Sequence, residues 1–380
     1  MTISSIDQLH QLSLSALIPN SLSEGQLTNL PATMNKLALV SLNQVIQLLT
    51  NKQALTPLGD AQTATQIKTA LNTAPRHEWL VDRWLVALTE HGLLQLQDHK
   101  YALTKVTPCT DIKAELQANY QALGFPSTMA DAHIRVLASL SELISDQLDI
   151  NQVLYQQSSP LVALAAYQTN YFTAYLNTAL AQYLTTQIKP GPMVKILELG
   201  GGTGLLTDSI FQQISGRPVQ YQFTDVSALF TKPMQTKLRT QIGARCRTLD
   251  IDRAFDEQAV PPASIDFIVA GNVLHNAQHI GHTLKHIRAA LKLGGQLLFT
   301  ESIADNPAML TAMQFLLSPA SDQVMLGHAD CRANSSQVFI DGSTWQKQLE
   351  QAGLQLMWRL PQPNSPLSAA GQALFIATAI

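Results

Sequence analysis

The segment ILELGGGTG at residues 196–204 restricts the fold of this chain more than any other part of its sequence. A short apolar run reaches Glu198, and Gly200, Gly202 and Gly204 follow it at alternate positions. Glycine takes positive φ angles at no steric cost and lets the backbone approach a ligand closely. A buried strand that leads through a glycine turn into a helix is typical of nucleotide-binding α/β units. The sequence therefore predicts parallel strands in this region.

The residues after Pro190-Gly191-Pro192 alternate between short apolar runs and amphipathic stretches, which is the pattern of an α/β domain. The expected strands are residues 194–199, 219–224, 244–249, 265–270, 296–301, 354–360 and 373–379. The expected helices between them are residues 205–215, 229–241, 280–292 and 306–317.

The first half of the chain has mostly helical periodicity, with apolar residues three and four positions apart in 33–50, 61–72 and 130–148. In residues 76–91, one helical face carries Leu80, Trp84, Leu85 and Leu88, and Gly92 suits the end of this helix. The runs LLQL, QDHK and YALT follow, and they predict the strand, turn and strand of a winged helix. Since 380 residues fit about two domains, we expect a helical, winged-helix-like domain over residues 1–150 and an α/β domain over residues 151–380.

Charge separates the two common uses of a winged helix, which are DNA binding and dimerisation. Residues 1–150 contain 13 acidic and 9 basic side chains, a net charge of −4, so the basic face of a nucleic-acid partner is not expected. The N-terminus has no signal-peptide pattern, and no run of 18 apolar residues occurs. Cys109, Cys246 and Cys331 are far apart in sequence. These features predict a cytoplasmic protein without a nucleic-acid or membrane partner, and they leave a homodimer open.

Two acidic residues follow the next two expected strands. Asp225 in FTDVS comes 21 residues after Gly204, close to the spacing of an acid that binds ribose hydroxyls, and Asp250 in LDID could accept a hydrogen bond from an adenine amino group. Ligands bind at the carboxyl ends of such strands, so the two acids support one nucleoside site. An NAD-binding domain is the alternative, but its glycine pattern is GxGxxG, whereas this chain has ExGxGxG.

Over about residues 160–380, the runs ILELGGGTG, FTDVSALF, LDID and NVLHNAQHIGHTLKHIRAALKLGGQLLFTE resemble class I methyltransferases. The closest likeness is to the carbon-methylating domains of polyketide and nonribosomal peptide synthases. This resemblance implies a Rossmann-like sheet of seven strands with an antiparallel last strand, and S-adenosylmethionine as the cofactor. It implies that Glu198, Gly200 and Gly202 hold the methionine part, Asp225 the ribose, and Asp250 with Ile251 the adenine. We also assign Asn272, which follows the fourth strand, to the cofactor site.

His275 and Glu301 follow the fourth and fifth expected strands and are the candidate catalytic residues. Methyl transfer to a weakly acidic C–H or O–H group needs a base with a pKa near 7, and histidine has one. A carboxylate on the far ring nitrogen would fix the tautomer and stabilise the imidazolium. In the resembling synthase domains, a histidine and a glutamate at these motif positions form the catalytic dyad. His279, His282 and His286 are expected on the polar face of a helix.

His328, in GHADCR, is a further candidate. Together with His275 and Asp330 it could bind a divalent metal ion, although a loop histidine that contacts substrate or solvent is the expectation that we favour.

Three functions fit these residues. The first is carbon methylation beside a carbonyl, on a carrier-bound β-ketoacyl group or a free keto acid, in secondary metabolite biosynthesis; FTDVS and NVLHNA favour it. The second is methylation of a small-molecule hydroxyl, which the winged-helix-like region slightly favours. The third is a cofactor-binding regulator without catalysis, and the presence of both His275 and Glu301 argues against it.

Overall fold

All seven expected strands form a single sheet in the order β6-β5-β4-β7-β8-β10-β9 in the computed structural model, which describes residues 3–57, 59–104, 111–156, 159–214, 216–241, 243–320 and 323–380. Cys109 lies outside these ranges. The strands are β4 (Val194–Leu199), β5 (Val219–Asp225), β6 (Ala244–Thr248), β7 (Ile265–Gly271), β8 (Leu291–Ser302), β9 (Leu354–Leu360) and β10 (Gln372–Ala379). Six of them agree with the predicted ends to within one residue, and β8 begins five residues earlier than predicted.

Strands β4 to β8 run parallel, and β10 is antiparallel to both of its neighbours. This confirms the predicted class I methyltransferase fold with its antiparallel final strand. The strand order reverses at β4, because β5 lies on one side of it and β7 on the other. A crevice opens at such a switch point, at the carboxyl ends of the strands. The helices that flank the sheet are α10 (Tyr171–Gln187), α11 (Leu205–Ile214), α12 (Ala228–Lys237), α13 (Ile280–Ala290) and α15 (Gly342–Gln351).

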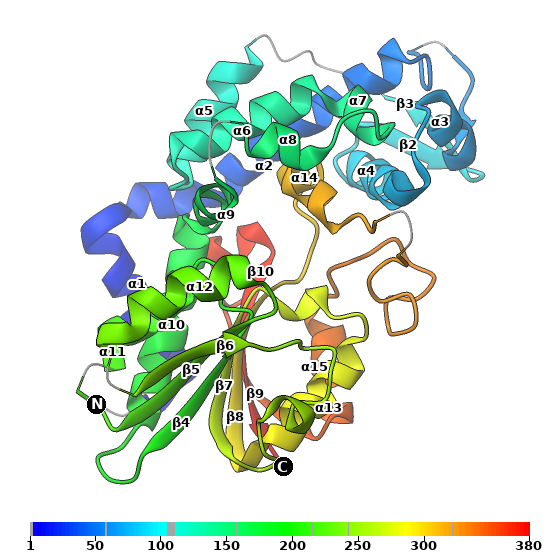
Figure 1. The fold of residues 1–380 in the computed structure, drawn as a ribbon. Coiled ribbons are helices and arrows are strands. Elements are labelled where there is room, and N and C mark those ends of the chain that lie inside the picture. The colour runs from blue at the N-terminus through cyan, green and yellow to red at the C-terminus, as the bar shows by residue number, and fades with distance from the viewer. Residues whose placement is uncertain are drawn as a thin grey trace.

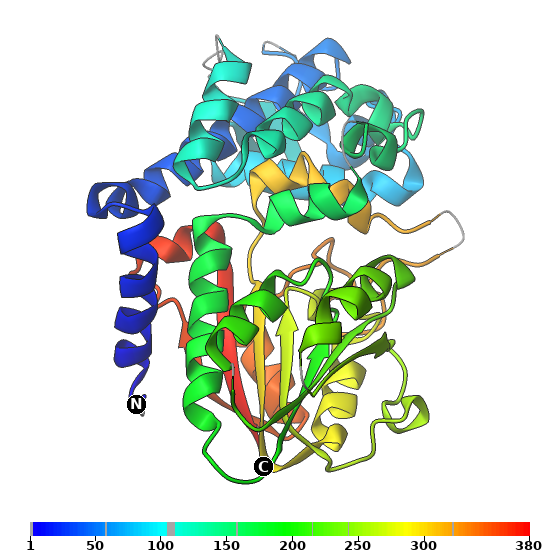
Figure 2. The ribbon, with the colours of Figure 1, turned by 60° about the vertical axis from the view of Figure 1, so that its left-hand side comes forward.

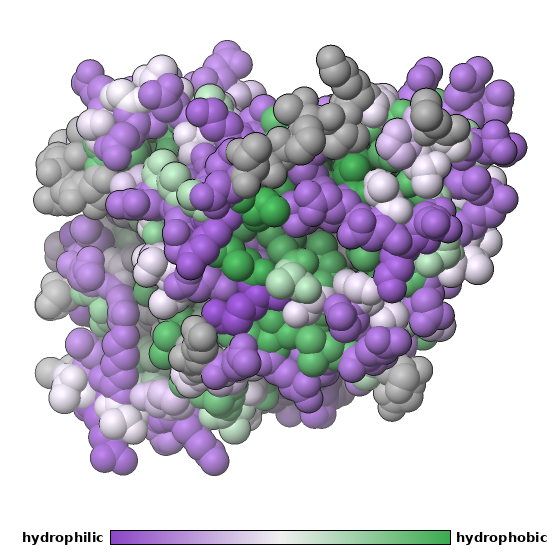
Figure 3. Space-filling model, turned by 90° about the horizontal axis from the view of Figure 1, so that it is seen from above, coloured by the Kyte–Doolittle hydropathy of each residue, from purple (hydrophilic) through white to green (hydrophobic). Residues whose placement is uncertain are grey.

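A helical part covers this crevice, so that the molecule has an upper helical layer and a lower sheet layer (Figures 1 and 2). Its elements are α1 (Ile6–Ser21), α2 (Glu24–Asn51), α3 (Ala64–Ala70), α4 (Glu78–Glu90), α5 (Ile112–Ala122), α6 (Ser127–Ala138), α7 (Leu140–Ile144), α8 (Ile150–Leu154) and α9 (Pro160–Gln168). In space-filling view, apolar side chains gather in the middle of its outer face, framed by polar ones (Figure 3). Within the described ranges, no helix is long and apolar enough to cross a membrane.

The winged-helix-like pattern is present in the structure. Helix α4 precedes the hairpin of β2 (Leu94–Gln97) and β3 (Lys100–Leu103), and β1 (Gln62–Thr63) completes a three-stranded sheet. Gly92 has a φ of +69°, as expected at a left-handed helix end. The predicted apolar face of α4 is buried, with Trp84 and Leu88 at most 1% exposed. Because α4 packs against α14 (Pro307–Leu310), its apolar face is part of the core.

Chain segments cross between the two layers in both directions. Residues of α14 (Pro307–Leu310) and of η5 (Met313–Leu317), which follow β8, lie among the helices of the first half, and α1 packs along α10 and β9 at the side of the sheet (Figure 2). Arg83 forms an ion pair of 2.5 Å with Asp305 across the same junction. The predicted domain boundary at residue 150 coincides with the first residue of α8.

The single helix expected over residues 306–317 is wrong, because the chain breaks between α14 and η5. The indole nitrogen of Trp84 donates to the carbonyl oxygen of Leu310 at 2.9 Å, and in a continuous helix that oxygen would accept a bond from a residue four positions later. The Thr311 hydroxyl also donates to the carbonyl oxygens of Pro307 and Ala308. Side chains therefore occupy the carbonyl oxygens of Ala308 and Leu310, which a continuing helix would use, and the helix ends here.

A buried polar chain holds α14 to the helical part. His133 contacts the Tyr120 hydroxyl through Nδ1 at 2.8 Å and the Thr311 hydroxyl through Nε2 at 2.9 Å, and all three side chains have no exposed surface. Burial lowers the pKa of His133 to about 3, so its imidazole is neutral at physiological pH. A neutral ring with both nitrogens paired satisfies the requirement that buried polar groups be hydrogen-bonded.

Thr311→Val should therefore lower the free energy of unfolding by about 1–3 kcal/mol, because valine keeps the shape of threonine but leaves Nε2 of His133 unpaired. Urea denaturation followed by circular dichroism measures the change. Thr28→Val is the matched control, since Thr28 is exposed on α2, and it should change stability by less than about 0.5 kcal/mol. Equal stability of Thr311→Val and the wild type would show that the chain to His133 contributes nothing.

Candidate active site

The glycine turn lies between β4 and α11, at the switch point of the sheet. Gly200 has a φ of +55°, and a Cβ added there would come within 2.2 Å of a methyl carbon of Val273. Gly202 has a φ of +53°, and its N–H donates to Oδ2 of Asp225 at 3.0 Å. The turn therefore needs glycine for conformation at both positions and for space at the first. It also brings Gly202, one of the predicted cofactor residues, beside Asp225 at the end of the next strand.

Glu198 is completely buried at the end of β4. Its Oε2 accepts hydrogen bonds from the hydroxyls of Thr207 at 2.7 Å and Tyr221 at 2.8 Å, whereas its Oε1 is buried without any partner. Burial raises the pKa of this carboxyl to about 7, against the opposing effect of the two hydroxyl donors. An unpaired buried carboxylate oxygen is costly unless a ligand completes it.

A hollow of about 560 Å³, part of it open to solvent, lies over the glycine turn. Glu198 lines it, so its unpaired oxygen is available to a cationic group such as the ammonium of S-adenosylmethionine. The glycine turn and the glutamate thus fit the methionine part of this cofactor. The lining residues are Tyr167, Gln168, Thr173, Leu176, Asn177, Glu198, Gly200, Gly201, Leu205, Leu206, Gly271, Asn272, Thr300, Glu301 and Gln372.

The residues predicted for the nucleoside lie beyond this lining, along the ends of β5 and β6. Asp225 is buried, and its Oδ1 accepts the Ser227 N–H at 2.8 Å. Burial raises the pKa of Asp225, while hydrogen bonds from three backbone N–H groups lower it by a smaller amount. The Asp250 carboxylate follows β6 and accepts the Asp252 N–H at 3.0 Å. The carbonyl oxygen of Ile251 accepts the Thr283 hydroxyl at 3.2 Å. These positions fit a nucleoside that extends from the cavity across two strand ends.

His275 and Glu301 form a direct pair between the ends of β7 and β8. Nδ1 of His275 lies 2.8 Å from Oε2 of Glu301, and the backbone N–H of His275 donates to Oε1 of the same carboxylate at 3.1 Å. Glu301 has no exposed surface and His275 is 5% exposed. Because the carboxylate can only accept, Nδ1 carries the proton and the lone pair is on Nε2. No described residue hydrogen-bonds that Nε2 atom.

Asn272 turns the chain after β7 so that His275 returns over Glu301. It has a φ of +54°, a conformation that asparagine tolerates better than most residues. Its N–H donates to the carbonyl oxygen of Thr300 at 2.8 Å, and its Oδ1 accepts the N–H and hydroxyl of Ser302, both at 3.1 Å. These bonds tie the turn to β8, and Asn272 lies in the wall of the cavity.

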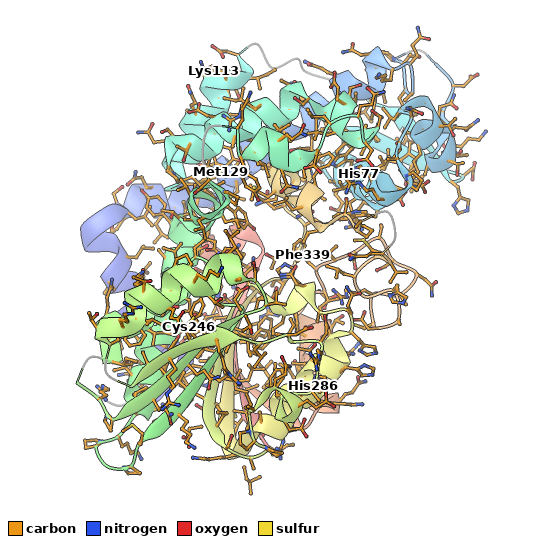
Figure 4. The ribbon with its side chains drawn as sticks, viewed as in Figure 1. His77, Lys113, Met129, Cys246, His286 and Phe339 are labelled. Atoms are coloured by element: carbon orange, nitrogen blue, oxygen red, sulfur yellow. The ribbon has the colours of Figure 1, made fainter. Side chains whose placement is uncertain are left out.

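A second chamber, of about 500 Å³, lies beside the first and under the helical part. Tyr167 and Gln372 line both chambers, and Phe339, which lines the second, packs on the His275 ring with centroids 4.9 Å apart. Figure 4 shows Phe339 at the level between the helical part and the sheet. The lining residues are Met34, Leu37, Phe125, Tyr167, Asn170, Phe172, Ser302, Ala304, Asn306, Met309, Gln314, Phe339, Ala370 and Gln372.

Tyr167 is a candidate site residue that the sequence did not indicate. Burial raises its pKa to about 12, and the neighbouring Glu301 adds to this effect. The phenol therefore stays protonated and can donate a hydrogen bond in the wall between the chambers. Its run, PLVALAAYQ, reads as an apolar helix, and only the tertiary position of α9 gives the tyrosine its place.

The structure does not bring the candidate metal ligands together. His328 is exposed, and both carboxylate oxygens of Asp330 are occupied, Oδ1 by Arg332 and Oδ2 by Arg332 and the Ile280 N–H. In the described ranges, no three histidine, cysteine or acidic side chains are arranged to hold a metal ion. His279 and His282 stack on each other on α13 with ring centroids 3.7 Å apart, while His286 packs on Phe255.

The sheet, the glycine turn at its switch point and the acids at successive strand ends define a class I methyltransferase domain, whose cofactor is S-adenosylmethionine. In agreement, residues 197–297 match the family model described as "Methyltransferase domain". The predicted enzyme class and cofactor are thereby confirmed, and the NAD-binding alternative is set aside.

Known proteins extend this assignment by similarity. The hybrid PKS-NRPS synthetase lepA of Aspergillus flavus is 36% identical over 141 residues, which make up 36% of this chain but only 4% of that synthetase. The CurJ carbon methyltransferase superimposes with a TM-score of 0.80 at 21% identity, covering 98% of both chains. The trans-methyltransferase CalH, in complex with SAH, gives a TM-score of 0.61 at 19% identity over 93% of this chain and 91% of its own. The last two likenesses establish the fold of the chain.

If Asp225 binds the ribose, as the sequence predicts, Asp225→Ala should weaken the binding of S-adenosylhomocysteine by about 1.5–3 kcal/mol, because charge-assisted hydrogen bonds would be lost. Isothermal titration calorimetry measures this loss. Asp208→Ala is the matched control, because Asp208 pairs with Lys237 on the exposed side of α11. Unchanged affinity of the Asp225 variant for S-adenosylhomocysteine would show that Asp225 does not bind the ribose.

The affinity for S-adenosylhomocysteine should also rise about tenfold between pH 6 and pH 8. Glu198 has a pKa of about 7, so it is mostly protonated at the lower pH and mostly ionised at the higher one, and only the ionised form pairs with the ligand ammonium. In Glu198→Gln this rise should disappear, as measured by calorimetry at both pH values. A rise of the same size in the variant would assign the titration to another group.

Proposed function

We propose that this chain methylates a carbon atom next to a carbonyl group, with His275 as the base. The observation that carries the proposal is the pairing of Nδ1 with the buried Glu301, which leaves the lone pair of Nε2 available beside the chambers. A proton on a carbon α to a carbonyl can move to Nε2, and Glu301 then stabilises the imidazolium that forms. S-adenosylmethionine supplies the electrophilic methyl group.

The second chamber is the proposed binding site of the acceptor. Phe339, Phe125 and Met309 give it an apolar lining, while Gln314 and Asn170 add hydrogen-bonding groups. Its shared wall with the cofactor cavity contains Tyr167, whose protonated phenol can donate to an enolate oxygen as the α-proton leaves. The acceptor carbon would thus lie beside Tyr167, where the two chambers meet, with His275 packed against Phe339 of the second chamber.

The acceptor chamber continues toward the surface. A third hollow, of about 580 Å³, shares Met34, Asn306 and Ala370 with it and includes the exposed residues Pro31 and Asn35 of α2. We propose this as the acceptor entrance, either for a free β-keto compound or for an acyl chain on a carrier protein. Similarity to part of a hybrid PKS-NRPS synthetase, to the CurJ carbon methyltransferase and to the trans-methyltransferase CalH supports the carrier-bound class and a role in secondary metabolism.

Hydroxyl methylation would use the same base, since an O–H proton can also move to Nε2. The specific observation that favours it is the small sheet of β1, β2 and β3 beside α4, which resembles the N-terminal region of small-molecule O-methyltransferases. Assays with free keto acids, phenols and carrier-loaded β-ketoacyl groups, using cofactor labelled in its methyl group, separate these functions. Label on carbon supports the proposal, and label only on oxygen overturns it.

His275→Ala should retain cofactor binding while turnover falls by about 10²–10⁴-fold, the usual contribution of a general base. Glu301→Gln should lose less, because the amide oxygen can still accept from Nδ1, but it carries no charge to stabilise the imidazolium and its NH2 group faces the backbone N–H of His275. Without cofactor, the wild type should exchange the α-proton of a β-keto acceptor with deuterated water, and His275→Ala should not. Steady-state kinetics and NMR measure the two effects.

His282→Ala is the matched control, because His282 is exposed on α13 seven residues further along the chain and should keep both activities. Normal turnover and exchange in His275→Ala would mean that the proton leaves by another route.

A further inference from the structure

Arg332 lies directly behind the turn that carries His275, and its side chain is only 1% exposed. Nη1 donates to the carbonyl oxygen of His275 at 2.7 Å, and Nη2 donates to that of Ala277 at 2.6 Å. Nε and Nη2 also bind Asp330, at 3.1 and 2.8 Å, and Nη1 lies 3.5 Å from the Val338 carbonyl oxygen. A guanidinium has five N–H donors, and this environment offers five acceptor contacts.

Asp330 is the ion-pair partner of Arg332 and links it to α13. Its side chain has no exposed surface, and Oδ2 also accepts the N–H of Ile280, at the first residue of α13. Burial alone would raise the pKa of Asp330, but the bonds from Arg332 and from the Ile280 N–H hold it below its ordinary value. The pair thus bridges the His275 turn and the start of α13.

Gly327 leaves the space that this pair fills. A Cβ added there would lie 2.1 Å from Nε of Arg332 and 2.8 Å from Oδ1 of Asp330, and the φ of Gly327 is +73°. Gly327, Asp330 and Arg332 all belong to the run GHADCR, and all three contribute to this ion pair. Neither the cofactor site nor the catalytic pair uses them.

As a result, every polar group of His275 except one has a hydrogen-bond partner. Glu301 accepts its backbone N–H and its Nδ1–H from one side, and Arg332 binds its carbonyl oxygen from the other. Only Nε2 remains, and with its backbone fixed on both sides the ring cannot move without breaking a buried hydrogen bond. A base held in this way meets its substrate at one position, which matters because a misplacement of about 1 Å can cost 10²-fold in rate.

We propose that Arg332 is a positioning residue for the base, acting through the backbone of the His275 turn. The proposal rests on the proposed role of His275 in proton removal. Lysine would not replace it, because one ammonium cannot span two carbonyl oxygens while it also binds a carboxylate through two atoms.

The test compares Arg332→Lys and Arg332→Met with the wild type in the full chain. We expect kcat to fall by about 10–100-fold in Arg332→Met and by less in Arg332→Lys, with the KM for the acceptor and the affinity for S-adenosylhomocysteine changed by less than about threefold. The α-proton exchange rate should fall in parallel with kcat. Arg217→Met is the matched control, because Arg217 also donates to a backbone carbonyl oxygen, that of Ile188, near the opposite edge of the sheet.

An NMR measurement made without an acceptor tests the positioning role of Arg332 separately from the proposed methylation. In ¹⁵N-histidine-labelled wild type, NMR should show His275 as one Nδ1–H tautomer with narrow lines, and in Arg332→Met these lines should broaden or split. Should that variant fail to fold, Asp330→Asn, which keeps the shape of the side chain, gives the second test of the same signal. Unchanged His275 signals with full kcat in a folded Arg332 variant would overturn the positioning role. Failure of wild-type carbon methylation with altered His275 signals would overturn only the proposed reaction.

Discussion

The arrangement of this active site depends on one buried charge, that of Glu301. A carboxylate without solvent is costly unless its oxygens are paired, and here a single residue, His275, supplies a donor to each of them. To do so the chain must turn sharply after β7, which explains the left-handed Asn272 and its bonds to Thr300 and Ser302. Arg332 then satisfies the carbonyl oxygens that this turn leaves without helical or strand partners.

Strand β8, which carries Glu301, also connects the catalytic pair to the helical part. Three residues after β8 ends, Asp305 pairs with Arg83, and shortly afterwards Leu310 and Thr311 bond to Trp84 and His133. The helical part therefore does more than cover the crevice, because it supplies Met34, Leu37 and Phe125 to the wall of the second chamber. The shape of that chamber depends on both halves, and Tyr167 and Gln168 of α9 also bring the helical part to the cofactor cavity.

Much of the site could be predicted from sequence because the carboxyl ends of parallel strands meet at one edge. Glu198, Asp225, Asn272 and Glu301 all lie at such ends, so recognising the strands was enough to group them. Tyr167, Phe339 and Arg332 could not be found in this way, since α9 and the long segment after η5 reach the site only through tertiary packing. The break in the helix expected over 306–317 has the same origin, because the competing donor, Trp84, is more than 200 residues away in sequence.

The crossing of α14 and η5 into the helical layer has a consequence for how such a protein can change over evolution. A domain joined by a linker alone can be exchanged for another with little adjustment, because few contacts cross the boundary. Here the segment after the strand that carries Glu301 is itself part of the neighbouring core, so a replacement N-terminal region would need new partners for Asp305, Leu310 and Thr311. The acceptor range of this chain should therefore diverge by substitutions along the chamber walls, with the helical part and the sheet inherited together.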